Sequence, residues 1–242
     1  MQCLIISDIH ANLAALEAVL DDALDFDEVW CLGDLVGYGA RPNECVELVR
    51  GLPHTSLVGN HDRAAVGELS LSTFNAVARE ANKWTQEQLT SSSRDYLNGL
   101  PASLQKGDFC LAHGSPREPI WEYIMDASVA CRNFEHFSTP VCLVGHTNVP
   151  VLFRLDEESG RCEAELPPLP EPVHLGPERV IVNPGSVGQP RDGDPRASYA
   201  MLDTEAMTWE FRRVSYPVEV AQDRMRAEGL PRPLIDRLQA GR

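Results

Sequence analysis

Two hydrophobic patterns alternate along the first third of the chain: short continuous apolar runs, and segments whose apolar residues have helical spacing. Short apolar runs at residues 2–7, 28–32 and 55–58 end at polar or glycine residues and predict buried strands. Between them, residues 12–24 carry apolar side chains three or four positions apart, with Asn12 suited to cap a helix. Residues 42–50 begin with a proline, which the first turn of a helix accommodates. This alternation predicts a mostly parallel sheet flanked by helices.

Further elements follow, and strands dominate after residue 150. The pattern predicts helices at 72–89, 92–100, 127–137, 218–227 and 233–240, and strands at 108–112, 141–144, 151–155, 161–166, 180–182, 197–202 and 209–214. The prolines of 167–172 predict an extended loop. We expect the later strands to be largely antiparallel and to form a second sheet packed on the first. Helices would lie outside both sheets, and residues 1–242 would make one domain.

Composition narrows the class of protein. The chain has 242 residues, 43% of them hydrophobic, and a formal net charge of −15. It has no apolar stretch long enough to span a membrane, so we expect no association with a membrane. Its acidic surface would repel nucleic acid, so we expect no stable binding of nucleic acid. Seven cysteines without paired spacing predict free thiols and a cytoplasmic location.

Polar residues suited to metal binding recur where the predicted strands end. Five strand ends in turn carry Asp8 with His10, Asp34, Asn60 with His61 and Asp62, His113, and His146 with Asn148. The carboxyl ends of strands in open α/β sheets form the ligand crevice, so these side chains are expected at one edge.

The residue types favour transition metals, because carboxylate oxygen and imidazole nitrogen are ligands of Mn, Fe and Zn. Taken singly, each residue also has an ordinary interpretation: a structural histidine, an aspartate in a turn, or Asn60 at a helix start. Their recurrence at five strand ends favours the metal site. His54, His136 and His174 fall outside this set and are predicted to be structural or exposed.

The motifs also resemble a known family. Asp8-x-His10, Gly33-Asp34, Gly59-Asn60-His61-Asp62, His113-Gly114 and Gly145-His146 resemble those of the calcineurin-like metallophosphoesterase superfamily, in the same order. Residues 33–39, 113–116 and 183–188 look like its bacterial phosphodiesterase branch, which includes hydrolases of diadenosine polyphosphates. The resemblance implies a four-layer αββα sandwich of two mixed sheets flanked by helices.

The resemblance also implies a role for each position. Asp8 and His10 would hold one ion, Asp34 would bridge two, and Asn60, His113 and His146 would hold the second. A hydroxide bridging the ions, which would be Mn, Fe or Zn, would attack a phosphodiester or a nucleotide phosphoanhydride. His61 would act as general acid, and Asp62 would orient His61 or shape the pocket wall.

One position departs from the family pattern. Members usually carry a second histidine two residues after the one at His146, and here that residue is Asn148. An amide oxygen is a weaker and harder ligand than imidazole, so the first ion is expected to exchange more readily and to shift toward Mn or Mg. The alternative is an impaired site.

Substrate-binding groups are less distinctly marked. Arg117, Arg191 and Arg196 lie in loops and suit phosphate, although each also fits a surface charge, and Tyr38 could flank the substrate or pack on its loop. Residues 183–186 form either a turn whose amides face an anion or a loop that supports the metal edge.

Segments 64–100 and 115–137 are the expected cap, which favours a small phosphate ester or nucleotide as substrate. Two alternatives remain: a protein Ser/Thr phosphatase, and a non-catalytic scaffold. A strand near 151–166 could pair two subunits into a homodimer.

Overall fold

The computed structural model describes residues 1–166 and 171–242, and its core consists of two six-stranded sheets. The first sheet has the order β3 (His54–Ser56), β2 (Glu28–Cys31), β1 (Gln2–Ile6), β11 (Ala197–Asp203), β12 (Thr208–Val214) and β9 (Val173–His174). The second has the order β4 (Ser103–Lys106), β5 (Phe109–Ala112), β6 (Val141–Leu143), β10 (Arg179–Asn183), β7 (Val151–Asp156) and β8 (Arg161–Glu165). Residues 167–170 of the predicted proline loop lie outside the described residues.

Both sheets are mixed. In the first, β1 pairs in parallel with β2 and antiparallel with β11, and in the second β10 pairs in parallel with β6 and antiparallel with β7. The strands after residue 150 pair antiparallel with one another, as expected, but they do not form a second sheet of their own, because β11, β12 and β9 join the first sheet and β10, β7 and β8 join the second. The reason lies in burial: β11 is buried on both faces, so it fits an interior place beside β1 in the first sheet.

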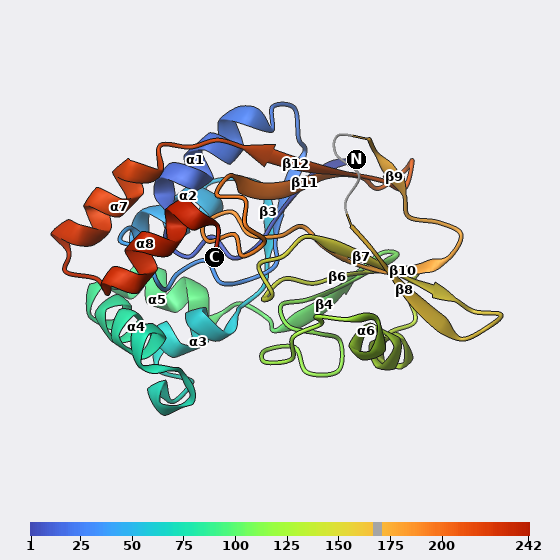
Figure 1. Ribbon diagram of the computed structural model, residues 1–242, viewed down its shortest axis with the longest axis horizontal. Coiled ribbons are helices and arrows are strands. Elements are labelled where there is room, and N and C mark those ends of the chain that lie inside the picture. The colour runs from blue at the N-terminus through green and yellow to red at the C-terminus, as the bar shows by residue number, and fades with distance from the viewer. Residues whose placement is uncertain (167–170) are drawn as a thin grey trace.

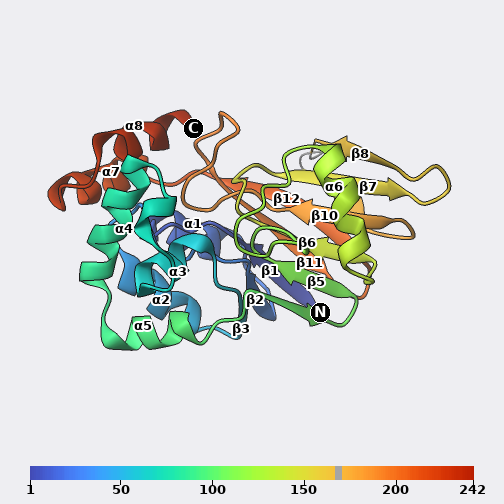
Figure 2. The ribbon, with the colours of Figure 1, turned by 90° about the horizontal axis from the view of Figure 1, so that it is seen from below.

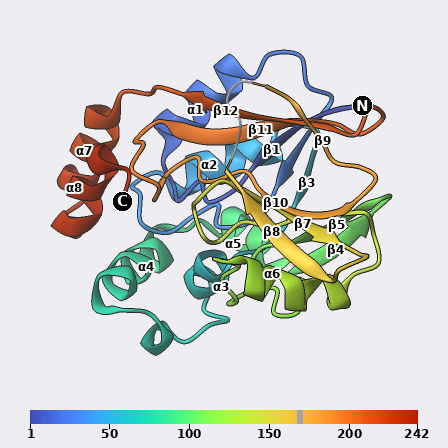
Figure 3. The same ribbon diagram turned by 45° about the vertical axis from the view of Figure 1, so that its right-hand side comes forward.

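Alternating side chains along the strands define four layers. Cys3 and Ile5 of β1 pack between the sheets, whereas Leu4 and Ile6 pack on the outer, helix-covered side. In β10, Val182 faces the other sheet and Ile181 packs on the side of α6 (Ala127–Asn133). Figure 3 shows α1 and α6 on opposite outer faces of the stacked sheets. The predicted αββα sandwich is confirmed.

The remaining helices gather on the outer side of the first sheet and at one end of the molecule (Figures 1 and 2). They are α1 (Leu13–Asp22), α2 (Pro42–Arg50), α3 (Asn60–Val66), α4 (Ala76–Gln88), α5 (Ser91–Asn98), α7 (Val218–Ala227) and α8 (Arg232–Ala240). None of the described helices is both long and apolar enough to cross a membrane.

Helix ends follow local capping chemistry. Asn12 caps α1 as predicted, its Oδ1 accepting from the Ala15 amide at 3.3 Å, and Pro42 lies in the first turn of α2. The predicted helix at 72–89 is split: a 3₁₀ turn at Leu71–Thr73 precedes α4, which Asn75 caps through the Ala78 amide at 2.9 Å. A second short 3₁₀ turn, Phe134–His136, ends the segment of α6.

Candidate metal centre

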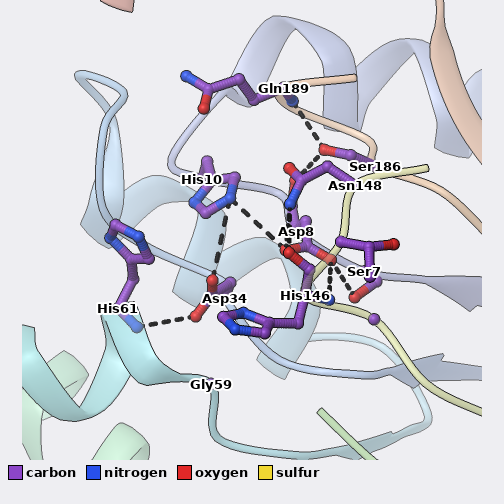
Figure 4. Close-up of polar contacts among 12 residues, drawn as sticks. Ser7, Asp8, His10, Asp34, Gly59, His61, His146, Asn148, Ser186 and Gln189 are labelled. Atoms are coloured by element: carbon purple, nitrogen blue, oxygen red, sulfur yellow. Dashed lines mark hydrogen bonds and ion pairs between the residues drawn. The ribbon is translucent and has the colours of Figure 1, made fainter. Parts of the chain in front are cut away.

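The loops after five strands converge at the carboxyl ends of both sheets. Asp8, His10, Asp34 and Asn60 follow β1, β2 and β3 of the first sheet, whereas His113, His146 and Asn148 follow β5 and β6 of the second. Each of these seven side chains is at most 2% exposed. Figure 4 shows most of them pointing toward one another. The structure thus brings together every residue predicted to bind metal.

One half of the cluster surrounds His113. Its Nδ1–H donates to the Leu32 carbonyl at 2.8 Å, which leaves a lone pair on Nε2 in the neutral ring. That nitrogen lies 3.2 Å from Asn60 Oδ1, 3.2 Å from His146 Nδ1 and 3.4 Å from Asp34 Oδ2. Atoms that carry lone pairs repel one another unless a proton or a cation lies between them. Asp34, His113 and His146 form a group that could hold a metal ion.

The other half surrounds His10. Its Nε2 lies 3.6 Å from Asp8 Oδ1 and 3.9 Å from Asp34 Oδ2 (Figure 4). His10, Asp34 and His61 form a second group of metal-binding geometry. Asp34 belongs to both groups, which places its carboxylate between the two candidate positions.

Several polar atoms facing this cluster have no hydrogen-bond partner in the described part of the chain. They are both ring nitrogens of His10, Nε2 of His146 and Oδ1 of Asn148. A buried polar atom without a partner costs about 1–3 kcal/mol, so such atoms seldom gather without a ligand. The donor set of imidazole nitrogens and carboxylate oxygens therefore fits divalent metal ions.

The electrostatics agree with a site for cations. Burial acts to lower the pKa of His113, but the carboxylates of Asp34 and Asp8 outweigh it and raise this pKa to about 9. Burial would likewise raise the pKa of Asp34, yet the charges of His113 and His61 hold it well below its usual range. Burial is also the main cause that lowers the pKa of His10 and His146. Asp34 is thus ionised and His10 and His146 are neutral, which are the forms that bind metal, whereas His113 holds a proton that a bound cation would displace.

The backbone around the cluster is strained. It adopts left-handed φ values at Asp8 (53°), His10 (49°), Asp34 (54°), His146 (65°) and Asn148 (60°). Non-glycine residues in this region cost about 1–3 kcal/mol each and concentrate at functional sites. Glycine permits close approach as well: a Cβ at Gly59 would lie 2.1 Å from Asp34 Oδ1, and one at Gly145 would lie 2.0 Å from Ser7 Oγ. Glycine is therefore required before Asn60 and His146 for a steric reason.

His61 reaches the centre from the first turn of α3, so Asn60 both starts a helix and faces the cluster. Nδ1 of His61 lies 3.0 Å from Oδ1 of Asn82 on α4. The Asn82 oxygen accepts the Nδ1 proton, so Nε2 of His61 has no hydrogen-bond partner in the described residues. Asp62 does not orient His61. Its two oxygens accept hydrogen bonds from the amides of Val36 and Gly59 at 3.0 and 2.9 Å, so Asp62 stabilises the backbone of the pocket wall. Asn82 carried no recognisable sequence signal.

Asn148 contacts the cluster through both atoms of its amide. Nδ2 donates to Asp8 Oδ1 and to the His146 carbonyl, each at 2.9 Å, while Oδ1 faces no donor in the described residues. Asp8 also accepts from Ser7 Oγ at 2.6 Å and from the His146 amide at 2.9 Å. Asn148 thus orients Asp8 and keeps one oxygen free for a ligand.

The loop after β10 supports the metal edge. The amides of Val187 and Gly188 donate to the carbonyls of Ser7 and Asp8 at 3.0 Å, and Ser186 Oγ donates to the Asp8 carbonyl at 2.8 Å. Within the turn at 183–186, Pro184 has no N–H and the Gly185 amide donates to Asn183 Oδ1 at 2.8 Å, which favours a supporting loop over an anion-binding nest.

The three arginines considered for substrate binding differ in their surroundings. Arg117 is ion-paired with Glu122, and Arg196 with Asp194. Arg191 forms no ion pair in the described residues, and its charge affects the pKa values of Asp8, His10, His61 and His146. The Tyr38 ring lies 4.2 Å from that of His61 and 4.6 Å from that of His10. Arg191 and Tyr38 therefore lie at the centre.

Aromatic side chains cover the site, as expected of a cap. The Phe74 ring lies 5.1 Å from the His61 ring and 5.2 Å from the Trp121 ring. The contact between Phe74 and Trp121 joins segments 64–100 and 115–137. Tyr123 stacks on His146 at a centroid distance of 3.8 Å. The sequence analysis assigned Trp121 and Tyr123 no role of their own, because their contacts with His146 depend on the tertiary fold.

Two stacked mixed sheets with a buried cluster of metal-binding side chains at their shared edge are the architecture of a metallophosphoesterase. The chain belongs to the calcineurin-like phosphoesterase superfamily, whose domain profile matches residues 1–207. Membership of this family of phosphoesterases supports the prediction that the chain is a hydrolase.

Its similarity to known proteins extends over the whole chain. A metallophosphoesterase from Sphaerobacter thermophilus, known from its crystal structure, has 53% sequence identity to this chain. The two structures superpose with a TM-score of 0.92 over 100% of this chain and 99% of that one. An uncharacterized protein of Methanocaldococcus jannaschii is 38% identical over 247 residues, which cover 98% of this chain and 97% of the relative. A hypothetical protein of Pyrococcus horikoshii OT3 shares the fold, with 22% identity and a TM-score of 0.79 over 100% and 98% of the two chains.

Proposed function

We propose that this protein uses two metal ions to hydrolyse a small phosphodiester or a nucleotide phosphoanhydride. The observation that carries the proposal is the convergence of unpartnered nitrogen and oxygen atoms on both sides of Asp34. Asp8, His10 and Asn148 would hold the first ion, Asn60, His113 and His146 the second, and Asp34 would bridge them. Such ions, of Mn, Fe or Zn, polarise a phosphoryl group and activate water at neutral pH.

His61 is the residue that we assign to proton transfer. Its Nδ1–H is held by Asn82, so it is Nε2 of the protonated, imidazolium form that would give a proton to the departing oxygen. The group His10, Asp34 and His61 also has metal-binding geometry, which makes direct coordination by His61 the competing assignment. His61→Ala separates the two: a general acid is worth about 10²–10⁴ in rate with metal content retained, whereas loss of a ligand also lowers the metal content.

The burial of the centre supports a small substrate. The proposed ligands are at most 2% exposed, and Tyr38, Phe74 and Tyr123 crowd the approach to His61 and His146. This access suits a small phosphate ester or a nucleotide better than a folded phosphoprotein. In a substrate panel, phosphopeptides would therefore be the poorest substrates.

The decisive experiment is hydrolysis of bis(p-nitrophenyl) phosphate with Mn²⁺, compared with the Asp34→Asn variant. We expect turnover that a chelator abolishes and that the variant lacks. Protein that binds metal and hydrolyses no phosphate ester would instead support the scaffold alternative.

Two further assignments complete the proposal. We place the protein in the cytoplasm, because its seven cysteines are free thiols. A homodimer would form through β8, which is the edge strand of the second sheet and offers unpaired backbone groups.

A further inference from the structure

Arg191 lies beside the metal centre without a carboxylate partner. Its amide donates to the Asn148 carbonyl at 3.1 Å, which ties the residue to the loop after β6. Its Nη2 donates to Gln189 Oε1 at 3.4 Å, its guanidinium also interacts with the Tyr38 hydroxyl, and its Nε is buried without a hydrogen-bond partner in the described residues. A guanidinium group in this state has donors available for a ligand.

Arg237 approaches the same place from α8. Its guanidinium carbon lies 6.0 Å from the centre of the Tyr38 ring, and its Nε donates to the main-chain carbonyl of Arg242. Burial lowers the pKa of Arg237, and the nearby charge of Arg191 lowers it further. Both guanidinium groups therefore lie beside Tyr38, and Arg237 is partly removed from water there.

This proximity is unexpected in so acidic a protein. The chain has 36 acidic residues, yet within residues 1–166 and 171–242 no Asp or Glu side chain lies within ion-pair distance of Arg191 or Arg237, and the Arg237 guanidinium donates only to the main-chain oxygen of Arg242. By contrast, Arg117, Arg212 and Arg213 are each paired with a carboxylate. Like charges that repel one another without a counter-ion in the protein are suited to an anion from outside.

A cavity adjoins Arg237 and Tyr38. It has a volume of about 530 Å³ and is lined by Tyr38, Arg237, Leu234 and residues 75–78 at the start of α4. This volume lies within the range of about 300–1,000 Å³ that is typical of ligand clefts. Tyr38 also packs against His10 and His61, so the cavity lies next to the metal centre. The first turn of α4 has no acidic residue, which leaves its positive helix end unopposed.

We propose that Arg191 and Arg237 bind a second phosphate of the substrate, one that is not hydrolysed. The protein would then prefer compounds in which the scissile phosphate adjoins another phosphate over isolated phosphodiesters. This inference rests on the proposed function, but its central step, anion binding by the arginine pair, can be tested without turnover.

The first test titrates pyrophosphate into metal-free protein in the presence of a chelator, by calorimetry. We expect Arg191→Gln and Arg237→Gln each to weaken binding at least about tenfold, the loss typical of a charged hydrogen bond. Arg232→Gln is the matched control, because Arg232 lies on the same helix but is 89% exposed and paired with Asp236. Arg191→Lys keeps the charge and should recover part of the affinity. Wild-type protein that does not bind pyrophosphate, or glutamine variants that bind it as the wild type does, would overturn the proposal.

The second test compares kcat/KM for a nucleoside triphosphate with that for bis(p-nitrophenyl) phosphate in Mn²⁺. The ratio should fall at least about tenfold in Arg237→Gln and stay constant in Arg232→Gln. An unchanged ratio in Arg237→Gln would count against the second phosphate site. If the wild type hydrolyses neither compound, the proposed function fails, while the pyrophosphate titration still decides the role of the arginines.

Discussion

At the scale of single residues, Asn148 would determine how tightly the proposed first ion is held. Its amide nitrogen orients Asp8, and its Oδ1 is the unpaired atom that faces the centre. An imidazole binds transition metals more strongly than an amide oxygen does, so Asn148→His should lower the Kd for Mn²⁺ by about tenfold. Asn148→Ala should raise it by about 10–100-fold, because Asp8 loses its donor as well.

Metal titration followed by elemental analysis measures both variants. If Asn148→His binds metal more weakly than the wild type, then the donation from Nδ2 to Asp8 matters more than coordination by this residue. The prediction of a readily exchanged first ion would then lose its basis.

Asn82 is a positioning residue for His61. Since its Oδ1 accepts from Nδ1 of His61, Asn82→Leu should free the imidazole to rotate and lower kcat by about tenfold, with KM little changed. Asn82→Asp keeps an acceptor oxygen and should restore most of the rate. A loss of stability without a selective fall in kcat, or equal rates in the two variants, would show that Asn82 only fills space.

At the scale of elements, Glu122 links the loop after β5 to α6. It accepts from Ser115 Oγ at 2.7 Å and from Asn133 Nδ2 at 2.8 Å, and it pairs with Arg117. Burial opposes its ionisation, but the hydrogen bonds from Arg117, Asn133 and Ser115 outweigh burial and lower the pKa of Glu122 from 4.5 to about 2. The ionised form therefore stabilises the folded protein.

A pH-dependent loss of stability follows from the direction of this shift. The contribution is fully present above pH 4.5 and is lost as the pH falls toward 2, because a folded-state pKa below the unfolded one favours folding only while the group is ionised. Glu122→Gln should cost about 1–2 kcal/mol at pH 7 and less at pH 3.5. Urea unfolding at both pH values measures the difference, with the exposed Glu157→Gln as control. A difference that does not depend on pH would contradict the prediction.

The same scale shows what the sequence could and could not predict. The strand ends at Asp8, Asp34 and His113 were recognisable because buried strands leave a clear apolar run before a polar residue. The assignment of strands to sheets could not be predicted, because hydrophobic periodicity shows which faces of a strand are buried but not which strand it pairs with. Arg237 was missed for a similar reason: on an amphipathic helix it reads as a surface charge until α8 packs beside Tyr38.

At the scale of the whole molecule, the centre joins the two sheets. Asp8 and Asp34 come from strands of the first sheet, whereas His113 and His146 come from strands of the second. The sheets share an apolar interface that includes Ile5, Trp30 and Val182, but at the metal edge this interface gives way to buried polar atoms without partners. A bound cation would therefore act as a cross-link at the place where apolar packing ends.

Metal removal should for this reason lower the stability of the whole protein. A ligand present at 100 times its Kd stabilises the folded state by about 2.7 kcal/mol, which for a chain of this size corresponds to a rise in Tm of roughly 5–10 °C. Calorimetry of chelator-treated protein with increasing Mn²⁺ should show a Tm that rises with metal concentration. Asp34→Asn should remove this dependence, because Asp34 belongs to both candidate groups. A wild-type Tm that is the same with and without saturating metal would mean that no cation joins the sheets, and the proposed centre would fail with it.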